Sequence, residues 1–197
     1  MVVMPETNFD KHERYTKMKN DIYLDDGKRM RHCAVCGKMF EVDFFNEHAL
    51  FCSDKCESQG GFAYVKVKRD GNVEVVKCDA GIVAADEIRG VIGGDVNVCD
   101  VSDIAKGYNS LPFALTQSLR YGDVIDHGRL NERASKVFDA IVVGDCVVVN
   151  GYADGTNADY ASFPENLANV IAERIRKSDK NESLVMPIRV PFPADDE

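Results

Sequence analysis

Long hydrophobic runs are missing from this sequence of 197 residues. The longest apolar stretch, residues 140–149, is interrupted by Gly144 and Asp145, and it is much shorter than the roughly 20 apolar residues that a membrane-spanning helix needs. After its first few residues the N-terminus turns polar, so we expect no signal peptide and no contact with a membrane. Seven cysteines are an odd number in a chain too long for a small disulfide scaffold, which favours a reducing cytoplasm.

Familiar catalytic motifs are missing as well. The sequence has no glycine-rich phosphate loop, no dinucleotide fingerprint and no nucleophile elbow, so no reaction can be named from it. An enzyme of unknown reaction stays an alternative. Cys146 and His127 could act as nucleophile and base, but Cys146 lies within a valine run, which favours a buried, inert thiol. We expect the same of Cys78 and Cys99.

Four of the cysteines form two closely spaced pairs. Cys33 and Cys36 form a C-x-x-C pair, and Cys52 and Cys56 form a C-x-x-x-C pair. Four thiolates in this arrangement fit the tetrahedral shell of a structural zinc ion, and the chain between the pairs is the right length for a small hairpin. The spacing predicts a zinc site with these four ligands, against the alternative of four unrelated buried thiols.

The residues around the two pairs carry a family resemblance. The motif C-x-x-C-G-K-x-F at residues 33–40, followed by F-C-S-x-x-C at residues 51–56, resembles the FCS-type treble-clef zinc fingers of small bacterial, phage and eukaryotic chromatin-associated proteins. Bacterial zinc proteins that inhibit gyrase are among them. The resemblance covers about residues 31–60 and implies that the first pair lies in a tight knuckle at Gly37, the second pair at the start of a short helix, and that all four cysteines are ligands. It names no target, because such fingers bind DNA, RNA or protein, or only brace a fold.

Two histidines lie near the cysteines. His48 precedes Cys52 by four residues and could replace Cys56 as a ligand from the same helical face, but the F-C-S context favours Cys56. His32 is adjacent to the first ligand, and we expect it outside the ligand shell.

Three weaker patterns point to other functions. Asn46 and His48 suggest a ββα-metal nuclease. Such a site needs further metal-binding or catalytic residues in the helix that follows, and residues 57–64 contain no histidine and only Glu57 as an acid. Residues 101–120 have a helix-turn-helix rhythm in acidic surroundings, which favours two packed helices over DNA reading. Residues 154–165 have the outer spacing of a calcium loop but lack its fifth-place acid and sixth-place glycine, which favours an ordinary polar loop.

The charge is acidic and unevenly distributed. The formal net charge is -9, and residues 81–197 hold 11 Lys and Arg against 19 Asp and Glu. So acidic a body is a poor general DNA binder, whereas it suits a basic protein partner such as nucleic-acid machinery. Nucleic acid, as the alternative partner, would contact the finger and the basic cluster of Lys28, Arg29 and Arg31.

The pattern along the chain predicts an α+β fold. We expect an N-terminal extension at 1–30 with a short helix at 10–20, a zinc finger at 31–60 and an α+β domain at 61–197. Residues 62–68 and 72–77 alternate around Arg69-Asp70-Gly71, which predicts a β-hairpin. Apolar periodicity, caps and breakers predict the remaining elements: helices at 85–92, 102–108, 112–120, 132–139 and 164–177, and strands at 95–99 and 140–149. Residues 140–149 form either one bulged strand or two short strands around Gly144 and Asp145, and residues 183–192 form an edge strand or an extended tail.

These observations together predict a non-enzymatic, zinc-stabilised interaction protein. Its acidic α+β body would bind a protein partner within a larger assembly, while the finger braces or extends the contact. The family resemblance is typical of phage and bacterial proteins, so the expected location is the cytoplasm, or a host cytoplasm or virion for a phage protein.

Overall fold

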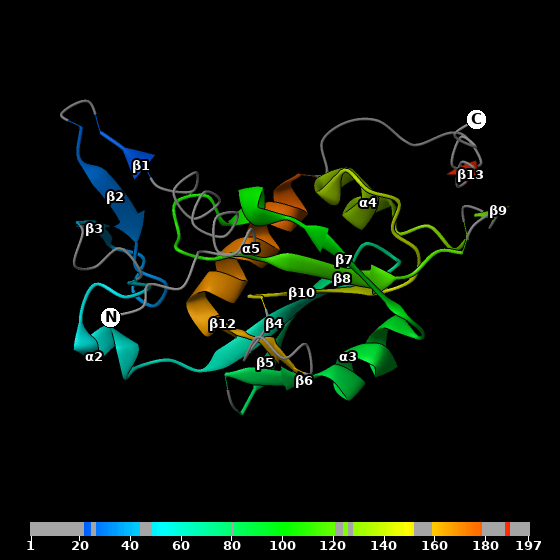
Figure 1. Ribbon diagram of the computed structural model, residues 1–197, viewed down its shortest axis with the longest axis horizontal. Helices are drawn as coiled ribbons and strands as arrows, with labels where there is room; N and C mark the ends of the chain where they lie inside the picture. Colours follow the sequence, from blue (N-terminus) through cyan, green and yellow to red (C-terminus); the bar gives the residue numbers. More distant parts are fainter. Residues whose placement is uncertain are drawn as a thin grey trace, which may run out of the picture.

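A six-stranded antiparallel sheet forms the centre of a mixed α+β fold (Figure 1). Its strands are β4 (Phe62–Val67), β5 (Val73–Cys78), β7 (Val96–Asp100), β8 (Phe113–Gln117), β10 (Cys146–Val149) and β12 (Phe163–Pro164). The computed structural model describes residues 22–24, 27–43, 49–79, 81–120, 124–125, 128–151, 159–178 and 188–189. The expected fold class is therefore confirmed, whereas the helix expected at 10–20 lies outside the described residues.

Strand β4 is the most extensively paired strand of this sheet. Along one edge it pairs with β5 over all six of its residues. Along the other edge it pairs with β10 at residues 65–67 and with β12 at residues 62–63. β10 then pairs with β8, and β8 with β7. The sheet thus joins strands from distant parts of the sequence around one hairpin.

The hairpin of β4 and β5 matches its prediction. Lys68 N–H donates to the Asn72 carbonyl at 2.8 Å, and Gly71 N–H donates to the Lys68 carbonyl at 2.8 Å. Gly71 has φ +83°, a conformation that glycine adopts without a steric penalty. The turn signal read at residues 69–71 is therefore the turn that closes the hairpin.

Side chains alternate between the two faces along each strand, and the inner strands β4, β8 and β10 have buried residues at successive positions, on both faces of the sheet. Helix α5 (Glu165–Lys177) covers one face, and helix α3 (Ala85–Ile92) covers the other (Figure 1). Val65 and Val67 share a buried cluster with Leu167 and other α5 side chains. Tyr64 instead belongs to the cluster of α3. A strand buried on both faces is apolar at successive positions, as in the all-valine end of β10.

Several expected helices are confirmed, and their caps explain them. α3 ends at Gly93, which has φ +78°, the left-handed conformation common after a helix. Helix α4 (Glu132–Phe138) begins after Asn131, whose side chain accepts a hydrogen bond from the Ala134 N–H. α5 begins at Glu165, with Pro164 as its cap residue, one residue later than the predicted start at 164.

The helix expected at 112–120 is wrong, because residues 113–117 form strand β8. β8 pairs with β7 on one side and with β10 on the other, so its place in the centre of the sheet overrides any local preference for helix. The preceding segment forms only the 3₁₀ turn η1 (Ser102–Ala105) in place of the helix expected at 102–108. These differences remove the helix-turn-helix interpretation.

The strand expected at 140–149 is shorter than its apolar run. Only β10 joins the sheet, while Val143 makes an isolated bridge to Leu130. Gly144, with φ +67°, lies between Val143 and β10. Of the strand expected at 183–192, the described part is β13 (Ile188–Arg189), which pairs with β9 (Val124–Ile125). A further pair joins β6 (Ile82–Ala84) to β11 (Asp159–Ala161).

The N-terminal part forms a separate small sheet beside the body (Figure 1). Its strands are β1 (Ile22–Tyr23), β2 (Arg29–His32) and β3 (Met39–Glu41), and the short helix α2 (Asp54–Glu57) follows. This small sheet holds the first cysteine pair in the connection between β2 and β3, and α2 carries the last cysteine. We call residues 31–60 the finger. Its limits, and the division of the chain into three parts, stay predictions.

Candidate metal centre

Four cysteine sulfurs come together in the finger. The Sγ atoms of Cys33, Cys36, Cys52 and Cys56 all lie within 4.8 Å of one another. Cys36 Sγ is 3.6 Å from Cys52 Sγ, and Cys52 Sγ is 3.7 Å from Cys56 Sγ. A regular tetrahedron with metal–sulfur bonds of about 2.3 Å has edges of roughly 3.8 Å, whereas a disulfide joins sulfurs at about 2.05 Å. The four free thiols are therefore spaced as metal ligands.

The first pair lies in a tight turn between β2 and β3. Cys33 N–H donates to the Lys38 carbonyl at 2.9 Å, and Gly37 N–H donates to the Cys33 carbonyl at 2.9 Å. Gly37 has φ +71°, which glycine adopts readily. The knuckle implied by the family resemblance is therefore present, with Cys33 buried and Cys36 exposed.

The second pair lies at the start of a helix of four residues. Cys52 precedes the cap residue Ser53, whose hydroxyl accepts a hydrogen bond from the Cys56 N–H at 3.4 Å. Ser53 thus fixes the first turn of α2 and directs Cys56 toward Cys52. Because Cys56 belongs to the cluster, the sequence prediction of four cysteines needs no substitute ligand, and His48 lies outside the described residues.

His32 sits next to the cluster without joining it. Its Nδ1 atom donates to the Gly37 carbonyl at 2.9 Å, and its ring lies 5.3 Å from the ring of Tyr108. This bond holds the knuckle in place from outside the sulfur shell, as expected of a residue that supports ligands rather than ligating.

The thiols of the cluster differ in acidity. Burial raises the pKa of Cys33, but hydrogen bonds from the backbone N–H groups of Cys36, Cys52 and Val35 outweigh burial and lower the pKa to about 6. Hydrogen bonding with the side chains of Cys36 and Cys56, together with burial, raises the pKa of Cys52 to about 12. At neutral pH the metal-free cluster therefore holds a thiolate at Cys33 and a protonated thiol at Cys52.

This difference predicts the pH dependence of metal binding. Since a metal binds thiolates, it must displace the Cys52 proton at any pH below about 12. We expect metal affinity to fall at least about tenfold for each pH unit lost between 8 and 6, and more steeply below about 6, where Cys33 also takes up a proton. Competition with a chelator of known proton affinity measures this dependence. An affinity that stays constant between pH 6.5 and 8.5 would remove Cys52 from the ligand set.

The remaining cysteines do not form a second site within the described residues. Cys146 is fully buried in β10, and burial raises its pKa far above the ordinary value, as expected for an inert thiol. His127 lies outside the described residues. Cys78 and Cys99 are half-buried rather than buried, because they lie on β5 and β7, at the edges of the central sheet. Burial also raises their pKa.

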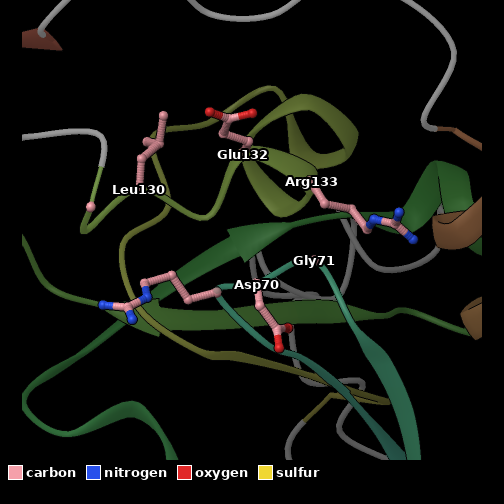
Figure 2. A pocket seen from close by; sticks show the side chains of 7 residues that line it. Asp70, Gly71, Leu130, Glu132 and Arg133 are labelled. Carbon is pink, nitrogen blue, oxygen red and sulfur yellow. The ribbon is translucent and has the colours of Figure 1, made fainter.

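A pocket beside the hairpin turn offers no catalytic arrangement (Figure 2). Its volume is ≈ 350 Å³, and its lining includes Asp70, Glu132 and Arg133. Figure 2 shows the Asp70 and Glu132 carboxylates pointing in different directions, with Arg133 directed away from both. Two acids that do not converge give no basis for acid–base chemistry, so this pocket adds no support to the enzyme alternative.

The basic cluster before the finger is less accessible than its sequence suggests. Arg31 is 1% exposed, so its guanidinium group does not lie on the surface. Lys28 Nζ is 3.5 Å from a Glu41 carboxylate oxygen, and Arg29 is half-buried. Nucleic-acid binding would therefore depend on Lys28 and Arg29, without Arg31.

Comparisons with known proteins found no relative of this chain. A scan against models of protein families and searches of curated proteins and of solved structures each found no match to this chain. Among the described helices, none has the length and the apolar character needed to cross a membrane.

Proposed function

We propose that the protein is a zinc-stabilised interaction protein without catalytic activity. The observation that carries this proposal is the gathering of four thiols, from two separate parts of the sequence, within 4.8 Å. All-sulfur tetrahedral shells select zinc or iron–sulfur clusters over harder cations. Four protein ligands around one zinc ion also leave no open position for substrate. Zinc would therefore hold the finger together rather than act in a reaction.

The arrangement around the thiols supports an FCS-type treble-clef finger. A knuckle with glycine at positive φ carries the first pair, and the second pair flanks the first turn of a short helix with a serine cap. Both features are those implied by the resemblance of residues 31–60. Addition of cobalt in place of zinc tests the geometry, because four tetrahedral thiolates give cobalt a strong visible absorption that octahedral oxygen ligands do not.

We further propose that the acidic body binds a basic protein partner. The net charge of -9 lies mainly in residues 81–197. An excess of one sign steers an oppositely charged partner toward this body and disfavours binding of nucleic acid to it. Exposed carboxylates occur on several elements of the body. They include Asp86, Asp95, Asp100, Asp103, Asp139 and Glu173.

Capture from a nuclease-treated bacterial lysate tests the partner. We expect one stoichiometric basic protein at about 0.15 M salt and its loss at about 1 M, where the Debye length falls to about 3 Å. The double variant Asp95→Asn/Asp139→Asn removes two exposed acids of the body, and asparagine tolerates the left-handed conformation of residue 139. It should weaken capture, unlike the matched variant Glu41→Gln/Asp43→Asn on the finger.

Two outcomes contradict this proposal. A partner that is captured from an untreated lysate but not from the nuclease-treated lysate would favour the nucleic-acid alternative. Failure to capture any stoichiometric protein at about 0.15 M salt would contradict the binding of a protein partner by the acidic body.

A further inference from the structure

Residues 104–108 connect the finger to helix α5. On one side, the His32 N–H donates to the Gly107 carbonyl at 2.7 Å. On the other side, Nη1 of Arg174 in α5 donates to the carbonyls of Ile104 at 2.7 Å and Lys106 at 3.0 Å. In Figure 1 the green segment between β7 and β8 extends toward the blue strands of the finger. Backbone bonds thus tie this segment to both parts.

Side chains reinforce the same connection. The Tyr108 ring lies 5.3 Å from the His32 ring, and Cζ of Arg174 lies 5.7 Å from the centroid of the Tyr108 ring. The His32 ring is itself bonded to the Gly37 carbonyl of the knuckle. A continuous series of contacts therefore leads from the cysteine knuckle through His32, Tyr108 and Arg174 to α5. We call these three residues the bridge.

Gly107 allows the two parts to approach closely. It has φ +89°, and a Cβ atom at this position would lie 3.1 Å from Cδ2 of His32 and 3.2 Å from Cδ1 of Ile22. Another residue would strain the backbone at this φ, and its Cβ would require the side chains of His32 and Ile22 to shift by a few tenths of an ångström. The sequence at this point is thus suited to a fixed contact rather than to a flexible linker.

The finger also contributes to the core of the body. Ala34, between the first two cysteines, is fully buried in the same cluster as Leu167 and Ile171 of α5. Phe51, which precedes Cys52, packs against that cluster. Closing the sulfur cluster therefore fixes two apolar side chains that fill the α5 side of the core.

We infer that metal binding in the finger stabilises helix α5, so that the finger and the α5 layer fold as one metal-dependent unit. This inference rests on the metal binding proposed above. Without metal the short elements of the finger lose their cross-link, and His32, Ala34 and Phe51 are then no longer held against the body. Coupling between two sites is reciprocal. Contacts made by Arg174 therefore strengthen metal binding, although Arg174 is not part of the sulfur cluster.

Amide hydrogen exchange on the full chain, with and without zinc, tests this inference. Removal of zinc by a chelator should speed exchange of the α5 amides at least about tenfold, a change of roughly 1.4 kcal/mol in opening free energy. This comparison needs no substitution. Exchange in α5 that is unchanged after zinc removal would overturn the inference while leaving metal binding intact.

Two arginines of α5 provide a matched pair of variants. Arg174→Gln breaks the bonds to residues 104 and 106, whereas Arg176→Gln breaks a bond of the same kind, from Nη2 to the Val73 carbonyl at 2.6 Å. We expect Arg174→Gln to weaken zinc binding several-fold and Arg176→Gln to leave it unchanged. Equal weakening by both would overturn the role of the bridge. A chain that binds no zinc at all would overturn both this inference and the proposed function, and zinc content measured beforehand separates the two cases.

Discussion

Replacement of Cys52 by serine is expected to abolish zinc binding. Cys52 Sγ has two sulfur neighbours within 3.7 Å, so its loss leaves three thiolates and an open coordination position. Structural zinc contributes on the order of 10 kcal/mol in isolated fingers, and most of this stabilisation should disappear. Elemental analysis should find about one zinc per chain in the original protein and less than a tenth of that in Cys52→Ser.

Limited proteolysis shows where the Cys52→Ser variant loses structure. Trypsin should cut rapidly after the exposed residues Lys38 and Lys55 in the variant and slowly in the zinc-loaded protein. The sequence alone predicts that the larger core survives this loss. The burial of Ala34 in that core adds the expectation that the α5 layer is weakened while β4 and β5 stay paired.

Cys78→Ser is the matched control, because it also removes a thiol that is not fully buried. Cys78 lies on β5, outside the four-cysteine cluster, so its variant should keep full zinc content. Full zinc occupancy in Cys52→Ser would show that Cys52 is not a ligand. Normal partner binding by a zinc-free variant would show that the finger only braces the fold.

Replacement of Asn131 by alanine is expected to cost about 3 to 5 kcal/mol in the free energy of unfolding. Asn131 is fully buried. Its Nδ2 donates to the carbonyls of Val67 at 3.1 Å and Gly144 at 3.0 Å, and its Oδ1 accepts from the Ala134 N–H at 3.1 Å. Loss of a cap costs about 1 kcal/mol, and each buried group left without its partner costs about 1–3 kcal/mol. For a chain of this size Tm should fall by roughly 10 °C.

Two further variants separate the contributions of Asn131. Serine keeps a capping oxygen but cannot donate to both carbonyls, so Asn131→Ser should recover only about 1 kcal/mol. Asn166→Ala replaces an exposed asparagine of α5 and should change stability by less than about 0.5 kcal/mol. Chemical denaturation measures the free energy of unfolding of Asn131→Ala, Asn131→Ser and Asn166→Ala. A cost below about 1 kcal/mol for Asn131→Ala would show that water replaces its hydrogen bonds.

Elements with explicit local signals were predictable from the sequence. Gly71 closes the hairpin, Gly93 ends α3 and Asn131 caps α4, each through backbone geometry encoded within a few residues. The cysteine spacing likewise predicted the cluster, because two closely spaced pairs of cysteines, separated by enough residues for a small hairpin, are typical of a four-thiolate metal site. These features depend on neighbours in the sequence.

Features set by distant residues were not predictable in this way. Residues 113–117 form a strand because β7 and β10 flank them. The local sequence does not predict that these two strands are its partners. Arg31 follows Arg29 by two residues in a basic segment, yet its side chain is buried. The contact of His32 with Tyr108 joins residues far apart in the chain, and a single sequence carries no signal of it.

The shared edge of β4 has a consequence for the order of folding during synthesis. A ribosome releases β4 and β5 early, and this hairpin forms quickly because its contacts are local. The other edge of β4 waits for β10 and then for β12, which ends at Pro164. Until these residues emerge, one edge of β4 in the growing chain has no partner and can pair with another strand in its place. The central sheet is therefore completed only after Pro164 has emerged from the ribosome.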